Sequence, residues 1–414
     1  MEEKNSEKKE RKMRDSGIPW IGEVPEGWEF SKIKYHCTMK SGDNITALDI
    51  SDNGEYPVYG GNGLRGFYKI YNKNGNHILI GRQGALAGNV HLVNGKFWAT
   101  DHAVIVTLKN DVFINYFFRM LESMNLNQYA FDTAAQPGLS VSRIMNLNIV
   151  LPNLKEQHRI ADFLGSKCSE IDTLIENLRA RMESAKEYKK AVITEAVTKG
   201  LDKDAKMKDS GVEWIGEIPE GWKVVRFKHI ASIKSNLVQP DKYMKYPQIA
   251  PDNIEKDTGR LLSHQTVEES GVISGNHLFY RGQILYSKIR PNLNKLTVVP
   301  FDGLCSADMY PIESKLPTLF MVYSMLSTYF VSQVSLIIQD RVKMPKINQE
   351  ELGEIKVAVP SQQEMLTIAD YLDSKCSEID ALLQNYEYQI ATLEEYKKSL
   401  IYEYVTGKKE VPEA

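Results

Sequence analysis

Three loop segments of this chain place base-recognising side chains among glycines. They span residues 59–68 (YGGNGLRGFY), 81–84 (GRQG) and 287–295 (SKIRPNLNK). Arginine, asparagine and glutamine can make paired hydrogen bonds to guanine and adenine edges, and glycine permits a close backbone approach. The segments therefore predict contact with DNA, although loops of this composition are common on protein surfaces. The candidate side chains are Asn62, Arg65, Tyr68, Arg82, Gln83, Lys288, Arg290, Asn292, Asn294 and Lys295.

The motifs of self-contained catalysts are missing from the sequence. It contains no Walker loop, no helical HExxH, and no Asn-Pro-Pro-aromatic or Asp-Pro-Pro-Tyr motif for amino-methyl transfer. Residues 61–66 match the dinucleotide-binding pattern GxGxxG, but no buried parallel strand precedes them and no long helix follows, so we interpret the match as a coincidence. We expect a protein that reads a partner without catalysing a reaction and without a cofactor or metal of its own.

An internal repeat indicates which elements position these loops. Residues 13–28 and 207–222 are identical at 12 of 16 positions, and so are residues 160–175 and 368–383. The first pair is offset by 194 residues and the second by 208, so 14 extra residues separate the second pair, within inserts that show no obvious sequence similarity. We call the repeated segments the frames and the segments that they enclose, residues 31–150 and 225–358, the inserts. Two similar frames around two dissimilar inserts predict two different binding surfaces on one pseudo-symmetric scaffold.

A long helix is expected after each insert. Seam residues alternate by four and three over residues 171–196 and again over 379–404, which is the 3.5-residue period of supercoiled helices. The first helix should run from about Glu156 to Val197, with Gly165 as an early interruption and Gly200 as a stop. Each apolar stripe needs a partner, and a pseudo-two-fold repeat would pair the two helices antiparallel.

Further residues are expected to end, align or anchor the long helices. Gly407 is the expected stop of the second helix. Lys189 and Lys397 fall at matching places on the seam, where they should reach out to solvent or fix the register. The repeated tryptophans should anchor the chain against an insert or a helix end, and they are Trp20, Trp28, Trp214 and Trp222.

Both inserts show the pattern of compact α/β domains. Short β-like runs alternate with turns, and one helical pattern follows them. In the first insert the strands are expected at 77–80, 89–93 and 103–107, with a helix over 112–125. In the second they are expected at 283–286, 296–299 and 309–312, with a helix near 318–334.

Charge is distributed unevenly along the chain. The net charge is −3, yet residues 31–150 carry 11 basic against 8 acidic side chains and residues 225–358 carry 16 against 13. Positive inserts on negative frames fit inserts that face phosphate and frames that face protein. Four unclustered cysteines and the lack of any apolar run of roughly 20 residues predict a cytoplasmic protein without disulfides or structural zinc. Cys168 and Cys376 should be buried as small hydrophobic residues.

The arrangement resembles the specificity subunit of Type I restriction–modification systems. Two variable domains alternate with two copies of a region that reads LPNLKEQHRIADFL over residues 151–164. The resemblance extends to 60–63, 81–85, 88–90, 97–102 and 136–140 in the first insert, and to 281–288 and 343–347 in the second. It adds Asn89, His102, Gln136, Arg281 and Lys343 to the candidate DNA contacts.

The resemblance implies a reader of an interrupted, two-part DNA site that recruits other subunits. Each domain would bind one half-site, and the paired helices would set the distance between them. The partners would be double-stranded DNA, two adenine methyltransferase subunits and, through the complex, motor-nuclease subunits. The methyl donor, ATP and magnesium would belong to those partner subunits. The candidate partner contacts are Glu156, Gln157, Arg159 and Glu364. The second copy departs from the pattern at 362–366 (QQEML), so its partner surface should differ slightly.

The expected fold class is α+β, with two compact α/β target-recognition domains separated by two long antiparallel coiled-coil helices in a pseudo-two-fold repeat. The rival hypothesis is a non-catalytic coiled-coil scaffold with two protein-binding domains. The expected boundaries are a disordered tail at 1–12, a first domain at 13–150, a first helix at 151–200, a second domain at 201–358, a second helix at 359–407 and a tail at 408–414.

Overall fold

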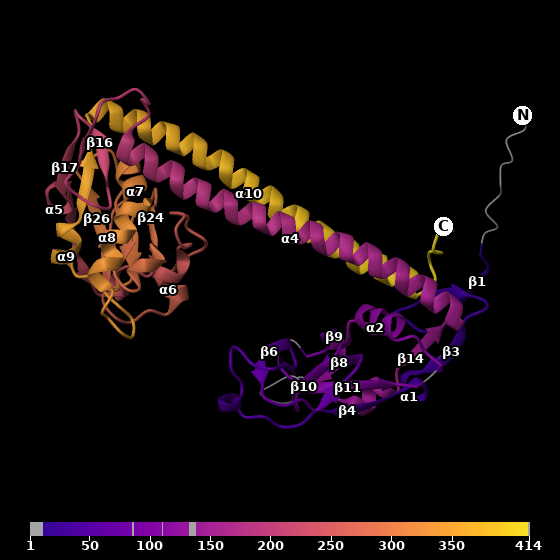
Figure 1. Cartoon of the computed structure of the whole chain (residues 1–414). Coiled ribbons are helices and arrows are strands. Elements are labelled where there is room, and N and C mark those ends of the chain that lie inside the picture. The colour runs from indigo at the N-terminus through magenta and orange to yellow at the C-terminus, as the bar shows by residue number, and fades with distance from the viewer. Residues whose placement is uncertain (1–10, 85–86, 110, 132–137, 413–414) are drawn as a thin grey trace, which may run out of the picture. The chain divides into compact units, whose positions relative to one another are not determined.

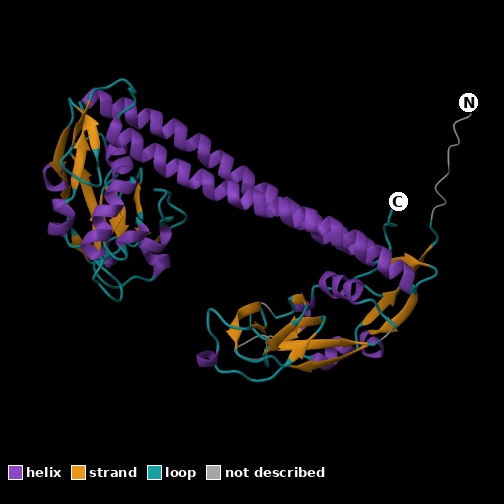
Figure 2. Ribbon diagram, in the orientation of Figure 1, coloured by secondary structure: helices purple, strands orange, loops and turns teal. Residues whose placement is uncertain are grey.

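The computed structural model describes residues 11–84, 87–109, 111–131 and 138–412. The chain divides into two compact units (Figure 1). The first unit comprises residues 1–178 and 388–414, and the second comprises residues 179–387. Each unit therefore holds one insert, one copy of the short repeat and parts of both long helices, and its architecture is mixed helix and sheet (Figure 2).

The first unit is framed by two small antiparallel pairs. One joins β1 (Met13–Asp15) to β2 (Glu23–Pro25), and the other joins β3 (Glu29–Lys32) to β14 (Asn148–Leu151). β3 leads into the short helix α1 (Ile33–His36), and α3 (Val141–Met145) precedes β14. The beginning and the end of the insert are thus held side by side before the long helix begins.

Two four-stranded sheets form the first insert. An antiparallel sheet has the order β4-β11-β8-β9, and a mixed sheet has the order β6-β5-β10-β7, in which β5 and β10 are parallel. The helix α2 (Ile114–Ser123) packs on β8 and β9. The strand bounds are β4 (Cys37–Ser41), β5 (Tyr56–Gly60), β6 (Gly63–Tyr68), β7 (Lys73–Asn74), β8 (His77–Gly81), β9 (Val90–Val93), β10 (Lys96–Ala99) and β11 (Ala103–Leu108).

Smaller elements complete this insert. The pair β12 (Ala130–Phe131) and β13 (Gly138–Leu139) lies beyond α2, and the 3₁₀ helices are η1 (Ala47–Asp49) and η2 (Leu126–Tyr129). The three strands and the helix expected in this insert are confirmed. The GxGxxG segment forms the turn and second strand of the antiparallel hairpin β5–β6, so it has no strand–helix context for a dinucleotide.

The second insert repeats this topology strand for strand. Its antiparallel sheet has the order β18-β26-β23-β24, and its mixed sheet has the order β19-β22-β25-β20-β21, with β20 and β25 parallel and β19 as an added edge. The strand bounds are β18 (Ala231–Ile233), β19 (Leu237–Val238), β20 (Pro247–Ile249), β21 (Gln265–Thr266), β22 (Asn276–Phe279), β23 (Ile284–Ser287), β24 (Leu296–Val298), β25 (Gly303–Cys305) and β26 (Met309–Ser314). Two inserts without obvious sequence similarity therefore share one fold.

The frame of the second unit repeats as well. β15 (Met207–Asp209) pairs with β16 (Glu217–Pro219), and β17 (Lys223–Arg226) pairs with β27 (Lys356–Val359). The short helices are α5 (Phe227–Ile230), α6 (Val267–Ser270) and α9 (Gln349–Glu354), and the 3₁₀ helices are η3 (Pro240–Lys242), η4 (Pro251–Asn253) and η5 (Pro291–Leu293).

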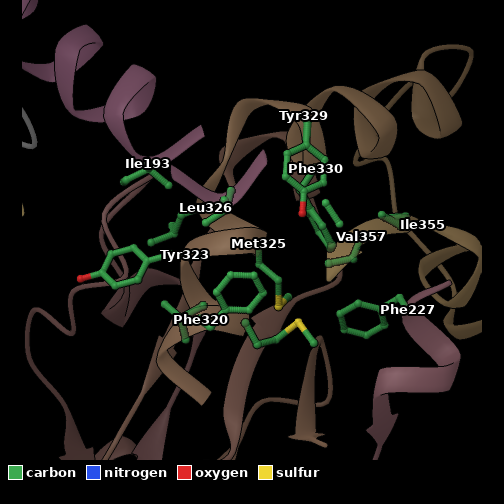
Figure 3. Close-up of a cluster of buried hydrophobic side chains, with 14 of the residues drawn as sticks. Ile193, Phe227, Phe320, Tyr323, Met325, Leu326, Tyr329, Phe330, Ile355 and Val357 are labelled. Carbon is green, nitrogen blue, oxygen red and sulfur yellow. The ribbon is translucent and has the colours of Figure 1, made fainter. Parts of the chain in front are cut away.

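The single helix expected near 318–334 is two helices, α7 (Thr318–Leu326) and α8 (Thr328–Ile338), bent by 58°. Ser327 between them is extended, and its hydroxyl donates to the Ser324 carbonyl at 2.6 Å. The freed Thr328 amide donates to the Thr194 hydroxyl at 2.9 Å, so the break is stabilised by the long helix of the same unit. Figure 3 shows Phe320, Met325 and Phe330 of these helices within the buried core of the unit.

The two long helices are α4 (Leu154–Lys199) and α10 (Gln362–Val405). They pack antiparallel within each unit, because Asp172 meets Lys397 in the first unit and Lys189 meets Asp380 in the second. The predicted antiparallel pairing is confirmed. α4 continues through Gly165 without a break, so the interruption expected there was wrong.

Most of the expected seam residues are buried or half-buried. The buried ones are Ile171, Ile175, Leu178, Leu400 and Tyr404 in the first unit, and Val192, Ala196 and Ile379 in the second. The two seam lysines keep only 12% (Lys189) and 21% (Lys397) of their side-chain surface exposed. Each ammonium reaches an aspartate on the facing helix, at 2.6 Å for Lys189 and 2.7 Å for Lys397.

Two repeated tryptophans pack against helix ends, as predicted. Both long helices stop at left-handed glycines, Gly200 at φ +75° and Gly407 at φ +72°. A Cβ on Gly407 would lie 2.9 Å from the Trp28 ring, and a Cβ on Gly200 would lie 3.2 Å from the Trp222 ring. Trp28 and Trp222 are both buried at 2% exposure, whereas Trp20 is half-buried and Trp214 is 43% exposed.

All four cysteines are buried and free, and the predicted burial of Cys168 and Cys376 is confirmed. Burial raises the pKa of the Cys37 thiol to about 12 and that of Cys376 to about 11. Among the described residues no single helix is long and apolar enough to cross a membrane. The bent pair α7–α8 meets the length and composition requirement jointly, and much of that pair lies in the core of the second unit.

Candidate nucleic-acid interface

The first polar cluster forms where β8 ends. The Arg82 amide donates to the His102 carbonyl at 2.9 Å, and the Arg82 carbonyl accepts from the Leu139 amide at 2.9 Å. The hairpin turn 60–63 lies against this backbone, because a Cβ on Gly61 would come within 3.2 Å of the His102 carbonyl oxygen. The Asn89 amide group donates to the Asn62 side chain at 3.4 Å.

The Arg65 side chain lies back against the same turn, because a Cβ on Gly60 would come within 2.5 Å of its Cδ, so six predicted contacts are brought together. Asn62, Arg65, Arg82 and Gln83 are exposed, and Asn89 and His102 are half-buried. The Arg82 guanidinium donates to the Ser41 hydroxyl at 3.3 Å, which steadies it at the end of β4. We name this set the first cluster; its members are Asn62, Arg65, Arg82, Gln83, Asn89 and His102.

Two predicted residues of the first insert are not part of this cluster. Tyr68 lies at the far end of the β5–β6 hairpin, where its ring packs edge-on against Trp98 with centroids 5.3 Å apart. Gln136 lies outside the described residues. Tyr68 is thus half-buried in the mixed sheet, away from the hairpin turn.

The second polar cluster occupies the equivalent place at the end of β23. The Lys288 amide donates to the Asp308 carbonyl at 2.9 Å, and the Lys288 carbonyl accepts from the Ile347 amide at 3.0 Å. These bonds repeat those of Arg82, so Arg82 and Lys288 hold matching positions. The Arg290 amide also donates to the Pro345 carbonyl at 2.8 Å.

The second cluster consists of Lys288, Arg290, Asn292 and Lys343. Arg290, Asn292 and Lys343 are exposed, and Lys288 is half-buried with its ammonium 5.4 Å from the centre of the Tyr310 ring. Arg290 and Lys343 adopt left-handed backbone at φ +44° and +59°. Strained backbone of this kind in non-glycine residues clusters at functional sites.

Three other candidates in the second insert have different surroundings. Arg281 precedes β23, at the opposite end of that strand from Lys288, and its amide donates to Asp302 at 2.8 Å. Asn294 is 1% exposed, and its side chain donates to the Met325 carbonyl at 3.1 Å. The Lys295 ammonium donates to the Pro251 carbonyl at 2.8 Å, and its side chain is 18% exposed. Asn294 and Lys295 therefore brace the loop from inside, and we withdraw them as DNA contacts.

Histidines lie beside both clusters and were not singled out in the sequence. The His91 ring lies 3.4 Å from where a Cβ on Gly63 would be, and burial lowers the His91 pKa. Burial, with the nearby Lys288 charge, also lowers the pKa of His277. Both rings are therefore favoured in their neutral form. The spacing of these histidines gives no periodic signal, so only the folded sheets reveal them.

The predicted partner contacts lie around the starts of the long helices. Gln157 is 2% exposed; it accepts from the Phe113 amide and donates to the Pro152 carbonyl, both at 2.9 Å. Glu156 accepts from Arg11, and Glu364 accepts from the Trp222 indole at 3.0 Å. Arg159 is exposed and donates to the Val411 carbonyl at 3.2 Å. Gln157 thus braces α4 from inside, and Arg159 is the most accessible of the four.

Comparison with known proteins shows which proteins the chain resembles. Residues 25–184 match the family model for the Type I restriction modification DNA specificity domain. The chain is 34% identical over 267 residues to the Type I restriction enzyme EcoDI specificity subunit of Escherichia coli, an alignment that covers 60% of each chain. It is 28% identical over 423 residues to the MjaVIII specificity subunit of Methanocaldococcus jannaschii, covering 93% of each. This chain is similar to the Type I restriction–modification specificity subunits.

The predicted resemblance is confirmed. The alignment with the Escherichia coli relative spans three fifths of that relative's own length. A solved structure of a type I R-M system, from work on its complex assembly and conformational transition, matches with a TM-score of 0.65 at 15% identity. The match covers 93% of this chain and 99% of that one, and it supports the fold. Among the described residues, no group of three or more His, Cys, Asp or Glu side chains is arranged to hold a metal.

Proposed function

We propose that this chain is the DNA-reading subunit of a Type I restriction–modification complex and recognises a two-part, interrupted site. The observation that carries the proposal is the equivalence of the two clusters. Arg82 and Lys288 follow matching strands of one shared fold and make the same backbone hydrogen bonds, yet the exposed side chains around them differ. One scaffold that presents two different polar surfaces suits two different half-sites.

The chemistry of the clusters fits base recognition. Exposed arginine, asparagine and glutamine side chains in the first cluster can pair with base edges, and the cations of the second can contact guanine or phosphate. The proposed contacts are Asn62, Arg65, Arg82, Gln83, Asn89, His102, Lys288, Arg290, Asn292 and Lys343. Arg281 and Tyr68 are assigned to flanking contacts, and Gln136 stays a prediction from the resemblance.

The domains, the long helices and the frame would each have a separate role. Residues 13–150 and 201–358 would be the two target-recognition domains, and residues 151–200 and 359–407 the helices that set the half-site spacing. The frame around Glu156, Arg159 and Glu364 would receive two methyltransferase subunits, with motor-nuclease subunits joining through the complex. The chain itself would bring specificity and no catalysis, in the cytoplasm. The methyl donor, ATP and magnesium would act in the partner subunits.

The matched pair Arg82→Ala and Lys288→Ala tests the proposal. The full-length chain, alone and with a methyltransferase partner subunit, would select binding sites from a random DNA pool. We expect the parent to select two short motifs at a fixed separation. Arg82→Ala should relax the motif of one half-site and Lys288→Ala that of the other, because a lost base contact costs ~1–3 kcal/mol at one position.

A control variant distinguishes the loss of a base contact from the loss of a positive charge elsewhere on the chain. Lys186→Ala removes an exposed cation that pairs with Glu183 on α4, outside both clusters, and should leave both motifs intact. Selection of no motif by the parent complex would contradict the proposal. Relaxation of both half-sites by either cluster variant would contradict the assignment of one cluster to each half.

A further inference from the structure

One loop of the second cluster exposes apolar side chains between its cations. The loop follows α8 (Figure 1) and reads Asp-Arg-Val-Lys-Met-Pro-Lys over residues 340–346. Val342 is 88% exposed and Met344 is 51% exposed, on either side of the exposed Lys343. A single exposed apolar residue is ordinary on a protein surface, but here two flank a cation at the centre of the second cluster.

The loop holds these side chains in a fixed conformation. Lys343 and Met344 are consecutive left-handed residues at φ +59° and +55°, a conformation that costs a non-glycine residue roughly 1–2 kcal/mol. Arg341 offsets this strain, because its guanidinium pairs with both carboxylate oxygens of Glu351 and also donates to the Lys346 carbonyl. Ile289 bridges to Lys346, which ties the loop to the segment that carries Arg290.

The charges around the loop favour a polyanion as its partner. Lys346 pairs with Asp308 at 3.2 Å, and Arg341 pairs with Glu351. Within the part of the chain that the structure describes, Arg290 and Lys343 form no salt bridge. One unneutralised cation, Lys343, therefore lies between Val342 and Met344, and the other, Arg290, lies on the segment that is bridged to this loop. A partner that satisfies these cations and also contacts the apolar side chains must offer both negative charge and an apolar group.

Duplex DNA meets that requirement in the major groove, where thymine presents a 5-methyl group beside the phosphate backbones. We propose that Val342 and Met344 form an apolar contact that reads a thymine methyl group in the half-site of the second domain, with Lys343 between them and Arg290 on the adjoining segment. The assignment rests on the function proposed above and extends it by naming the chemical group that is read. Arginine and lysine position the duplex, and the methyl contact adds discrimination against cytosine and guanine at that position.

The test removes the methyl group from the DNA and the apolar side chains from the protein. Each thymine of the second half-site is replaced in turn by deoxyuridine, and binding of the full-length chain, alone or with its modification subunits, is measured by fluorescence anisotropy. One replacement should weaken binding about fourfold, the ratio that corresponds to one buried methyl or methylene group of ~0.8 kcal/mol. The double variant Val342→Ala/Met344→Ala should bind the thymine and uracil duplexes equally.

The matched control is Leu319→Ala, which removes an exposed apolar side chain of the same domain. Leu319 is 45% exposed and lies beyond the end of β26, whose other end is next to the second cluster. This variant should retain the fourfold discrimination. Retained selection of the other bases of the second half-site by the double variant shows that its second domain is folded.

Several results would overturn the inference while the proposed function stands. They are specific binding with equal affinity for every uracil duplex, a second half-site without any A·T pair, and a fourfold loss that persists in the double variant. Failure of the proposed function has a different signature, since the parent complex would then bind no sequence specifically.

Discussion

The seam lysines lead to a quantitative prediction about the helix pair. Lys189 of α4 and Asp380 of α10 form an ion pair at 2.6 Å, with 12% of the lysine side chain and 49% of the aspartate side chain exposed. Lys397 and Asp172 repeat the pair at 2.7 Å, with 21% and 50% exposed. Replacing either aspartate by alanine leaves a largely buried ammonium without its acceptor.

The expected losses follow from these exposures. Breaking a fully buried pair costs roughly 3–5 kcal/mol, and an exposed pair is worth roughly 0–1 kcal/mol. Because each aspartate is half exposed, we expect Asp380→Ala to cost about 2 kcal/mol of local stability. Asp172→Ala should cost about 1 kcal/mol, because Lys397 is more exposed and can reach water more easily.

A second variant isolates the cause of that loss. Lys189→Met places an apolar side chain on the seam and removes the charge that needs a partner, so it should be neutral or stabilising by up to about 1 kcal/mol. In this background Asp380→Ala should have almost no further effect. The pair would then serve to fix the register of the helices and contribute little net stability.

Hydrogen exchange of the full chain, followed by mass spectrometry over residues 183–195 and 374–386, provides the measurement. It reports local opening free energies and needs no two-state unfolding, which a chain of two units need not show. Equal losses from Asp380→Ala in the parent chain and in the Lys189→Met variant would refute the reasoning, because the loss would then not depend on the unpaired ammonium.

Three further predictions concern the helix ends, the helix length and pH. Gly407→Ala should cost about 2–3 kcal/mol of local stability and Gly200→Ala about 1 kcal/mol, since both positions need left-handed backbone and only a Cβ on Gly407 would lie 2.6 Å from Pro25. Gly165→Ala lies inside α4 with nothing within 4 Å of its Cβ, so it should stabilise the helix by roughly 0.5–1 kcal/mol. Hydrogen exchange around each glycine measures these local changes. Inserting one heptad after Arg181 and one after Gln389 lengthens each helix by roughly 10 Å, so methylome mapping should show a spacer longer by about 3 bp; unchanged spacing in a folded complex would mean that the helices do not set it. His91 and His277 have lowered pKa values, so the unfolded chain binds more protons at these sites, and stability present above pH 6.5 should be lost as the pH falls below it. The Tm should therefore fall less in His91→Gln than in the parent chain when the pH is lowered below 6.5. An equal fall in both would show that His91 does not cause the pH dependence.

Local patterns in the sequence determined a large part of the structure. The 3.5-residue period specified the two long helices, and Gly200 and Gly407 marked their ends, because seam spacing and left-handed glycines act over a few residues. The repeat indicated an antiparallel helix pair, and the family resemblance is confirmed by comparison. The interruption predicted at Gly165 was wrong, because a single glycine inside a helix costs only about 1 kcal/mol and a long, packed helix tolerates that cost.

Tertiary structure alone decided the rest. Ser327 breaks an apolar helical pattern because Thr194 of α4 caps the second half at Thr328, from a position 134 residues earlier in the chain. Asn294 and Gln157 turn inward because backbone groups brought close by folding satisfy them. The sequence also did not reveal that the two inserts share one topology. A core needs apolar residues of suitable total volume in the right pattern, but many different residues satisfy that need. The sequence therefore identified the scaffold and its loops, whereas the fold determined which loop side chains reach the surface.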